Sequence, residues 1–214
     1  MHLKKNFVIM KKNKLSIIKL KSFYNNYFNS ILDISKKLNL NNLEKAINLI
    51  EETIKNKNYI YVCGNGGSAA IANHYVCDFF KQLSKYTKLK AKIKSLNSDN
   101  YLISAIANDI SYDQIFRLQA ERYISKKDIL IIISSSGNSK NIIEVLKYCN
   151  KKKIKTIGFS NFSGGYLNKY CNISIHSKID NYGIGEDINH ILMHMIMQFI
   201  SINNLRKNSK KVIL

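Results

Sequence analysis

Apolar residues in this chain follow two different spacings, one on each side of about residue 58. Between residues 15 and 57 they recur every three to four positions, which predicts two amphipathic helices. We expect the first over 15–38 and the second to begin at Asn41 or Asn42, either of which can serve as its N-cap. From residue 58 onward, short β-branched and aromatic runs alternate with helical stretches. This part predicts strands at 59–63, 91–96, 128–134, 154–159 and 173–175, and helices at 69–83, 101–107, 112–123, 140–149 and 186–202.

Strands that alternate with helices in this way predict right-handed βαβ units and a parallel sheet. The run 128–134 is apolar almost throughout, as expected for a strand that is buried on both faces. We therefore interpret residues 1–214 as a single α/β domain. Within it we expect a disordered basic tail (1–14), N-terminal helices (15–57) and an α/β core (58–204).

The net charge of +20 is concentrated at the two ends of the chain. Residues 1–22 hold seven lysines, residues 205–214 hold four basic residues, and neither segment contains an acid. The ends thus supply eleven of the twenty excess charges, and the abundance of Lys, Asn and Ile without Pro is typical of an AT-rich genome. We interpret the charge as solvated surface and expect no specific nucleic-acid partner.

Several other classes of protein do not fit the composition. No apolar run approaches the roughly 18–20 residues that span a membrane, so we expect no membrane partner. The cysteines form no C-x-x-C pair, which argues against a zinc knuckle and favours buried thiols in a reducing compartment. The apolar stretch Phe7–Met10 is too short for a signal peptide. We therefore expect a cytoplasmic protein.

Two loops rich in small residues each join a predicted strand to a predicted helix. They are Gly64–Ser68 and Ser134–Ser139. Small residues allow close backbone approach, free N–H groups point out of the first helical turn, and the helix dipole favours an anion. Glycines that make a tight turn and serines that cap a helix would explain either loop alone. Two such loops at one sheet edge favour a site for the phosphate of a small molecule.

Three groups of polar residues on the helices could carry chemistry. His74 and Asp78 are four residues apart and share one helix face, although a surface pair would have the same spacing. On the last helix, polar residues spaced by four form a stripe. The simpler interpretation is that the histidines lie in a core or an interface and that the acid stabilises the helix dipole. That stripe comprises Glu186, His190 and His194, with Asp187 beside it. Asn108 and Asp109 could form an exposed turn or a helix C-cap.

Taken in order, these residues resemble the sugar isomerase (SIS) domain, and within it the phosphoheptose isomerases. The resemblance extends over about residues 43–202 and rests on both loops, the histidine of the first core helix, Asn108-Asp109 and the last helix. It implies a three-layer α/β/α sandwich with a flavodoxin-like parallel sheet. It also implies a homotetramer with active sites at subunit interfaces.

The resemblance implies roles for individual residues. The sugar phosphate would be held by Ser68, Ser134, Ser136 and Ser139, with Asn65 nearby, and the wider substrate site would include Gly66, Gly67, Asn108, Asp109 and Ser135. Asp78 and His194 would perform the proton transfers. Some members bind zinc, and the positions that match their ligands are His74, Asp78, Glu186 and His194.

Two of these positions depart from the family's pattern. Asp78 stands where the family commonly has glutamate, so its shorter arm requires a shifted substrate or a metal-bound water. Glu186 stands where glutamine is common, and a charged oxygen ligand favours a divalent metal. The two changes together suggest a divergent subgroup whose substrate could be another phosphosugar.

The function we expect is aldose–ketose isomerisation of sedoheptulose 7-phosphate to a heptose 7-phosphate for surface polysaccharide, through a cis-enediol. A non-catalytic SIS tetramer that binds a protein, such as a replication initiator, is the alternative. An SIS-type transcription regulator is a third hypothesis, but the first 57 residues contain no clear helix-turn-helix.

Overall fold

The computed structural model describes residues 17–206, and the expected basic tail at 1–14 lies outside the described residues. Five parallel strands form one sheet in the order β2-β1-β3-β4-β5. The strands are β1 (Tyr59–Gly64), β2 (Lys92–Ser95), β3 (Ile129–Ser134), β4 (Lys155–Ser160) and β5 (Ile173–His176). This order is that of the flavodoxin-like doubly wound fold, which confirms the expected fold class.

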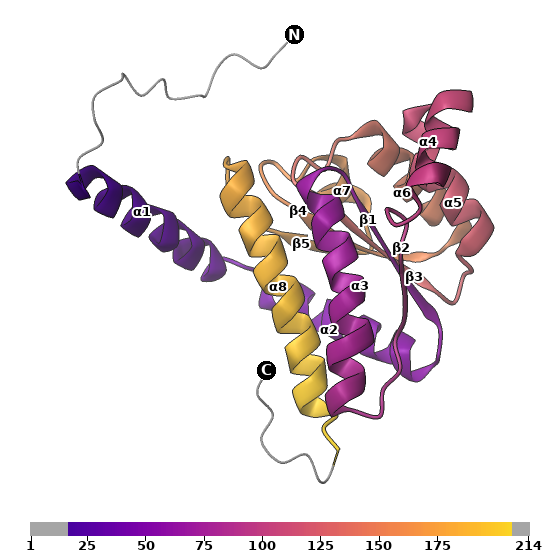
Figure 1. Ribbon diagram of the computed structural model, residues 1–214, viewed down its shortest axis with the longest axis horizontal. Helices are drawn as coiled ribbons and strands as arrows, with labels where there is room; N and C mark the ends of the chain where they lie inside the picture. Colours follow the sequence, from indigo (N-terminus) through magenta and orange to yellow (C-terminus); the bar gives the residue numbers. More distant parts are fainter. Residues whose placement is uncertain (1–16, 207–214) are drawn as a thin grey trace.

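Helices cover both faces of the sheet, as Figure 1 shows. They are α1 (Ile17–Ser35), α2 (Leu40–Lys55), α3 (Gly67–Tyr86), α4 (Asn100–Asp109), α5 (Ile115–Tyr123), α6 (Lys140–Lys152), α7 (Gly165–Tyr170) and α8 (Tyr182–Asn203), with a short 3₁₀ turn, η1 (Tyr112–Gln114), before α5. One sheet face packs on α2, α3 and α8, and the other packs on helices α4 to α7.

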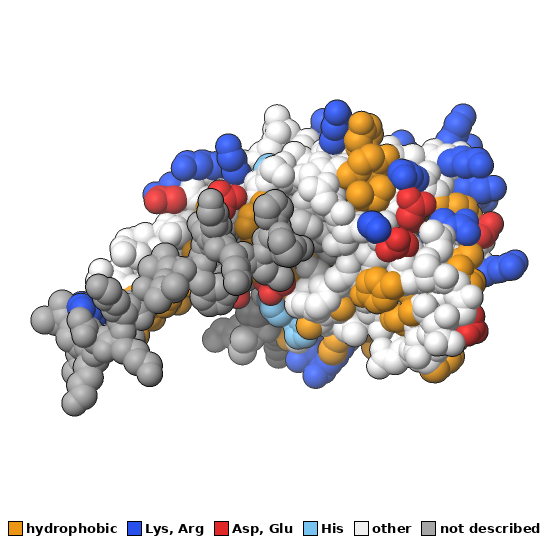
Figure 2. All heavy atoms as spheres, turned by 90° about the horizontal axis from the view of Figure 1, so that it is seen from above, with side chains coloured by type: hydrophobic (Ala, Val, Ile, Leu, Met, Phe, Trp, Pro, Cys, Tyr) orange, Lys and Arg blue, Asp and Glu red, His pale blue; other side chains and the backbone are white. Residues whose placement is uncertain are grey.

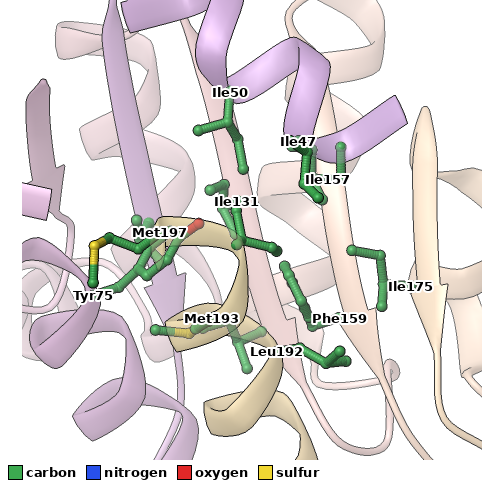
Figure 3. Packing of buried hydrophobic residues seen from close by; sticks show 14 of the residues in the cluster. Ile47, Ile50, Tyr75, Ile131, Ile157, Phe159, Ile175, Leu192, Met193 and Met197 are labelled. Atoms are coloured by element: carbon green, nitrogen blue, oxygen red, sulfur yellow. The ribbon is translucent and has the colours of Figure 1, made fainter. Parts of the chain in front are cut away.

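Alternate residues of the central strand supply two separate cores. Ile129, Ile131 and Ile133 pack on the side of α3 and α8, whereas Leu130 and Ile132 pack on the side of α5 and α6. This follows from the period of two along a strand, and burial on both faces explains why the whole run is apolar. Figure 3 shows the first core, in which the strands meet side chains from α2, α3 and α8.

The first helix extends away from the body of the molecule (Figure 1). Along its length the apolar side chains Phe23, Tyr24 and Phe28 are half or more exposed. The hydroxyl of Tyr27 ties the helix to α8 by donating a 2.6 Å hydrogen bond to the Asp187 carboxylate. That hydrogen bond, more than burial, raises the pKa of Tyr27 to about 12.

The sequence prediction was wrong about the ends of two helices and missed a third. The N-cap of α2 is Asn39 rather than Asn41 or Asn42, since its side chain accepts from the Asn42 N–H. Helix α8 begins at Tyr182, because Asn181 caps it by accepting from the Ile184 N–H. Glu186 therefore lies in the second turn instead of at the helix start. The six-residue α7 was not expected, because a glycine cap followed by a glycine in the first turn does not favour a helix.

Basic side chains are spread over several separate places on the face in Figure 2, with acidic ones among them. Among the described helices, none is both long enough and apolar enough to cross a membrane.

Candidate functional site

The two small-residue loops lie side by side at one edge of the sheet. Strands β1 and β3 are neighbours, and the loop after each strand leads into a helix. β2 is added on one side of β1, and β3 and the later strands are added on the other side. The crossovers from β1 and β3 therefore leave on opposite faces of the sheet, which opens the crevice where doubly wound proteins bind ligands. Gly66 and Gly137 adopt positive φ values of +54° and +65°, so each loop turns where glycine is favoured.

Amide side chains fix the loop after β1. Asn65 and Asn141 exchange two hydrogen bonds of 2.9 Å, which join this loop to the start of α6. Asn97 accepts from the Gly64 N–H at 3.1 Å and donates to the Gly64 carbonyl at 2.8 Å. Asn97 and the buried Asn141 were not predicted, because their partners are distant in sequence and no motif marks them. Both would position the loop.

The serine loop after β3, residues Ser134–Ser139, is stabilised by hydrogen bonds between its own residues. Ser134 Oγ accepts from the Gly137 N–H at 3.2 Å, and Ser136 Oγ accepts from the Asn138 N–H at 3.3 Å. Ser139 is the N-cap residue of α6. The Ser135 hydroxyl is buried and has no hydrogen-bond partner among the described residues. A buried hydroxyl without a partner is costly, so this one has unused capacity toward a ligand.

A second cluster lies where α3 and α8 pack side by side (Figure 1). The Nε2 atoms of His74 and His194 are 3.0 Å apart. Asp78 Oδ2 lies 3.1 Å from His194 Nε2 and 3.5 Å from His74 Nε2. The structure therefore brings together three of the four predicted zinc ligands and both residues predicted to transfer protons.

His190 joins this cluster from one turn before His194 on α8. The two rings stack with centroids 4.5 Å apart, and the His74 ring meets the His190 ring edge-on at 4.9 Å. Burial lowers the pKa of His190, and the neighbouring His194 and His74 lower it further. The neutral form that this favours is the form that binds metals.

Family membership follows from comparison with known proteins. The model of the family described as "SIS domain" matches residues 23–161. The chain belongs to the SIS domain family. It is 38% identical to a phosphoheptose isomerase of Aliarcobacter butzleri over 74% of this chain and 83% of that protein. It is also 38% identical to a probable phosphoheptose isomerase of Thermoplasma acidophilum over 77% of this chain and 91% of that protein.

A solved structure supports the fold of this SIS domain. The phosphoheptose isomerase of Neisseria gonorrhoeae superimposes with a TM-score of 0.77, covering 86% of this chain and 98% of that one. At 24% sequence identity this likeness concerns the fold alone.

Two sets of predicted residues of this SIS domain make contacts outside the histidine cluster. Asn108 and Asp109 form the exposed end of α4, where Asn108 Nδ2 donates to Asp109 Oδ1 at 2.9 Å. Glu186 lies against Gly67 at the start of α3, so close that a Cβ added to Gly67 would collide with its carboxylate. The metal-ligating group found among the described residues consists of His74, His190 and His194 and does not include Glu186.

Proposed function

We propose that this chain is an aldose–ketose isomerase that interconverts sedoheptulose 7-phosphate and a heptose 7-phosphate for surface polysaccharide synthesis. The observation that carries the proposal is the contact of Asp78 Oδ2 with His194 Nε2 at 3.1 Å, in a fold that also has two phosphate-suited loops. The names of the curated relatives support the reaction and the sugar. A protein that only bound a partner would not require this acid–base pair.

The phosphate would be bound by the loops between β1 and β3. Ser68 in the first turn of α3 and the hydroxyls of the serine loop are the proposed donors, with Asn65 beside them. The positive ends of two helix dipoles favour a dianion at this edge. The unpartnered hydroxyl of Ser135 supports the assignment, since it could donate to a phosphate oxygen. Ser134, Ser136 and Ser139 complete the proposed set.

The reaction requires two proton transfers on neighbouring carbons. One group removes a proton from the carbon beside the carbonyl, which gives a cis-enediol, and the same or a second group returns a proton to the adjacent carbon. Asp78 and His194 take these roles, since a carboxylate and an imidazole in mutual contact can exchange a proton with substrate and with each other. Asp78 is only partly buried, so substrate can reach it.

The cluster also has donors that fit a zinc ion. Three imidazoles and one carboxylate are the ligand types that zinc prefers, and the described side chains that converge here are of those types. His74, His194 and Asp78 are the residues of the expected set that would hold the ion. When bound, zinc would polarise the substrate carbonyl as a Lewis acid.

The first test of the proposal is turnover. Purified protein is incubated with sedoheptulose 7-phosphate, and ¹H and ³¹P NMR spectra follow the appearance of an aldose 7-phosphate. We expect conversion to an equilibrium mixture of ketose and aldose. Absence of conversion by folded protein that still binds the sugar phosphate would contradict the assigned substrate and favour the binding-protein alternative.

We further propose a homotetramer with active sites at subunit interfaces. Along α3, Asp78 lies ten residues after Ser68, a rise of about 15 Å, so the phosphate loops and the acid–base pair of one subunit are well separated. A phosphate on the loops of one subunit would therefore present its reacting carbons to the acid–base pair of another. Exposed apolar side chains on α1 and α8 support association; they include Leu20, Phe23, Phe28, Ile191 and Phe199.

The oligomer proposal predicts that placing negative charge on the apolar face of α1 lowers the molar mass of the assembly in solution. Replacing Phe23 and Phe28 with aspartate is expected to dissociate the assembly, because buried carboxylates without partners are costly. Size-exclusion chromatography with light scattering should give about four times 24.7 kDa for the wild type and less for the variant. Tyr101→Asp, at the exposed start of α4, is the control and should leave the mass unchanged. A monomeric wild type would contradict the proposal.

We also propose that residues 1–214 form a single SIS domain that works in the cytoplasm. The four cysteines support the location, because all are unpaired and two are fully buried thiols, as in proteins of reducing compartments.

A further inference from the structure

The three histidines between α3 and α8 have an arrangement that the expected zinc set does not explain. His190 and His194 are four residues apart on α8, so both project toward α3 on one face, and His74 meets them from that helix. One ring nitrogen of each of the three lies within 4.8 Å of the others. The expected set has no place for His190.

Distances within this group agree with shared coordination. Nitrogens bound to one tetrahedral zinc ion at about 2.0–2.1 Å lie about 3.3 Å apart. The Nε2 atoms of His74 and His194 are separated by 3.0 Å, which is close to that value. The whole group lies within 4.8 Å, so the ring nitrogen of His190 has to move closer before all three can share one ion.

One ring nitrogen of His190 makes no hydrogen bond to the described residues. Its Nε2 atom is buried and has no hydrogen-bond partner among the described residues. A buried polar nitrogen left in this state costs free energy that a donor, an acceptor or a cation would recover. The ring is held by stacking on His194 rather than by a hydrogen bond of that atom.

Glu186 meanwhile has another role in the same structure. Its carboxylate lies against Gly67, the first residue of α3. A negative charge at that position interacts favourably with the positive end of the α3 dipole. Gly67 leaves room for this approach, because a Cβ at that position would displace the end of the Glu186 side chain.

We propose that the divalent metal site of this chain uses His74, His190 and His194 as its nitrogen ligands, with His190 replacing Glu186 in the set. The inference depends on one part of the proposed function, namely that a metal ion binds at this cluster. Three imidazoles favour zinc and other late first-row divalent ions over magnesium or calcium. Asp78 is not a ligand in this set and remains beside the site, 3.1 Å from His194 Nε2. While the ion is bound, His194 Nε2 holds the metal, so Asp78 alone removes and returns the proton.

The test compares metal affinities of full-length protein that has been stripped with a chelator. Zn²⁺ is titrated in competition with a chromophoric chelator, and Co²⁺ is titrated while its visible absorption is recorded. We expect one equivalent per chain in the wild type. His190→Ala and His190→Phe, the second of which keeps a stacked ring, should each weaken Zn²⁺ binding at least 100-fold and lose the Co²⁺ band.

Two control variants distinguish the three-histidine ligand set from the expected set that includes Glu186. Glu186→Ala should bind Zn²⁺ within about threefold of the wild type, and so should His176→Ala, on β5 away from the cluster. Loss of binding in Glu186→Ala with binding retained in both His190 variants would overturn the inference in favour of the expected set. A wild type that binds no Zn²⁺ would overturn it as well.

Turnover of sedoheptulose 7-phosphate is measured separately on the same preparations. Conversion by a wild type that binds no metal would overturn this inference and leave the proposed isomerase standing. Tight Zn²⁺ binding that depends on His190, without conversion, would support this inference and contradict the proposed substrate.

Discussion

Replacing Asp78 with asparagine is expected to lower kcat for sedoheptulose 7-phosphate by about 10²–10⁴-fold, the usual loss when a general acid–base group is removed. Asparagine keeps the size of the side chain but cannot accept a proton. His194→Ala should cause a loss of the same order, because it removes the partner 3.1 Å away. The measurement is initial rates at saturating substrate, which report kcat directly.

Two comparisons make this result specific. Asp187→Asn, on the same helix as His194, removes a carboxylate that bonds Tyr27 and should change kcat little. The double variant of Asp78 and His194 should lose little more than the worse single variant, because residues that act as a unit are not additive. Near wild-type rates in both single variants would contradict the assignment of the acid–base pair.

Replacing Gly137 with alanine is expected to destabilise the protein by about 3–5 kcal/mol. Its φ of +65° already disfavours any residue with a side chain, and the new Cβ would collide with the backbone at Gly164. The loop and the turn before α7 cannot separate easily, because the Leu167 N–H donates to the Gly137 carbonyl at 3.0 Å. Urea unfolding at fixed protein concentration gives the change in free energy.

Gly66 provides the matched control for this substitution. It also has a positive φ, +54°, but an added Cβ would have nothing within 4 Å. Gly66→Ala should therefore cost only the strain of this backbone conformation, about 1–3 kcal/mol. Equal losses in the two variants would mean that the contact between the serine loop and Gly164 contributes nothing to stability.

The sequence predicted the sheet better than it predicted the helix ends. All five strands lie where the sequence indicated. The signal was strongest for β1, β3 and β4, because a strand buried on both faces needs consecutive apolar residues, whereas β2 at the edge alternates lysine with other residues. Helix α8 begins four residues earlier than expected, since its start depends on the Asn181 cap and passes through two glycines. Short α7 was missed for a similar reason: contacts with β4 and β5, rather than propensity, hold it.

The candidate site was predictable where motifs carry it. The two loops and the pairing of His74 with Asp78 follow from spacing alone, and the meeting of His74 with His194 followed from the resemblance. The position of Glu186 was not predictable, because it depends on how far α8 lies along α3 and on the space left by Gly67. His190 was visible as part of a stripe, but its unpartnered nitrogen is a property of the folded packing.

The most direct test of the proposed mechanism is the fate of the transferred proton. Sedoheptulose 7-phosphate is converted in D₂O, and the aldose product is examined by NMR for deuterium on the carbon that received the proton. A cis-enediol handled by Asp78 and His194 predicts deuterium at that carbon, because both groups exchange protons with solvent. Product formed at the full rate with no deuterium would mean that no group in exchange with solvent carries the proton, and it would contradict the roles given to Asp78 and His194.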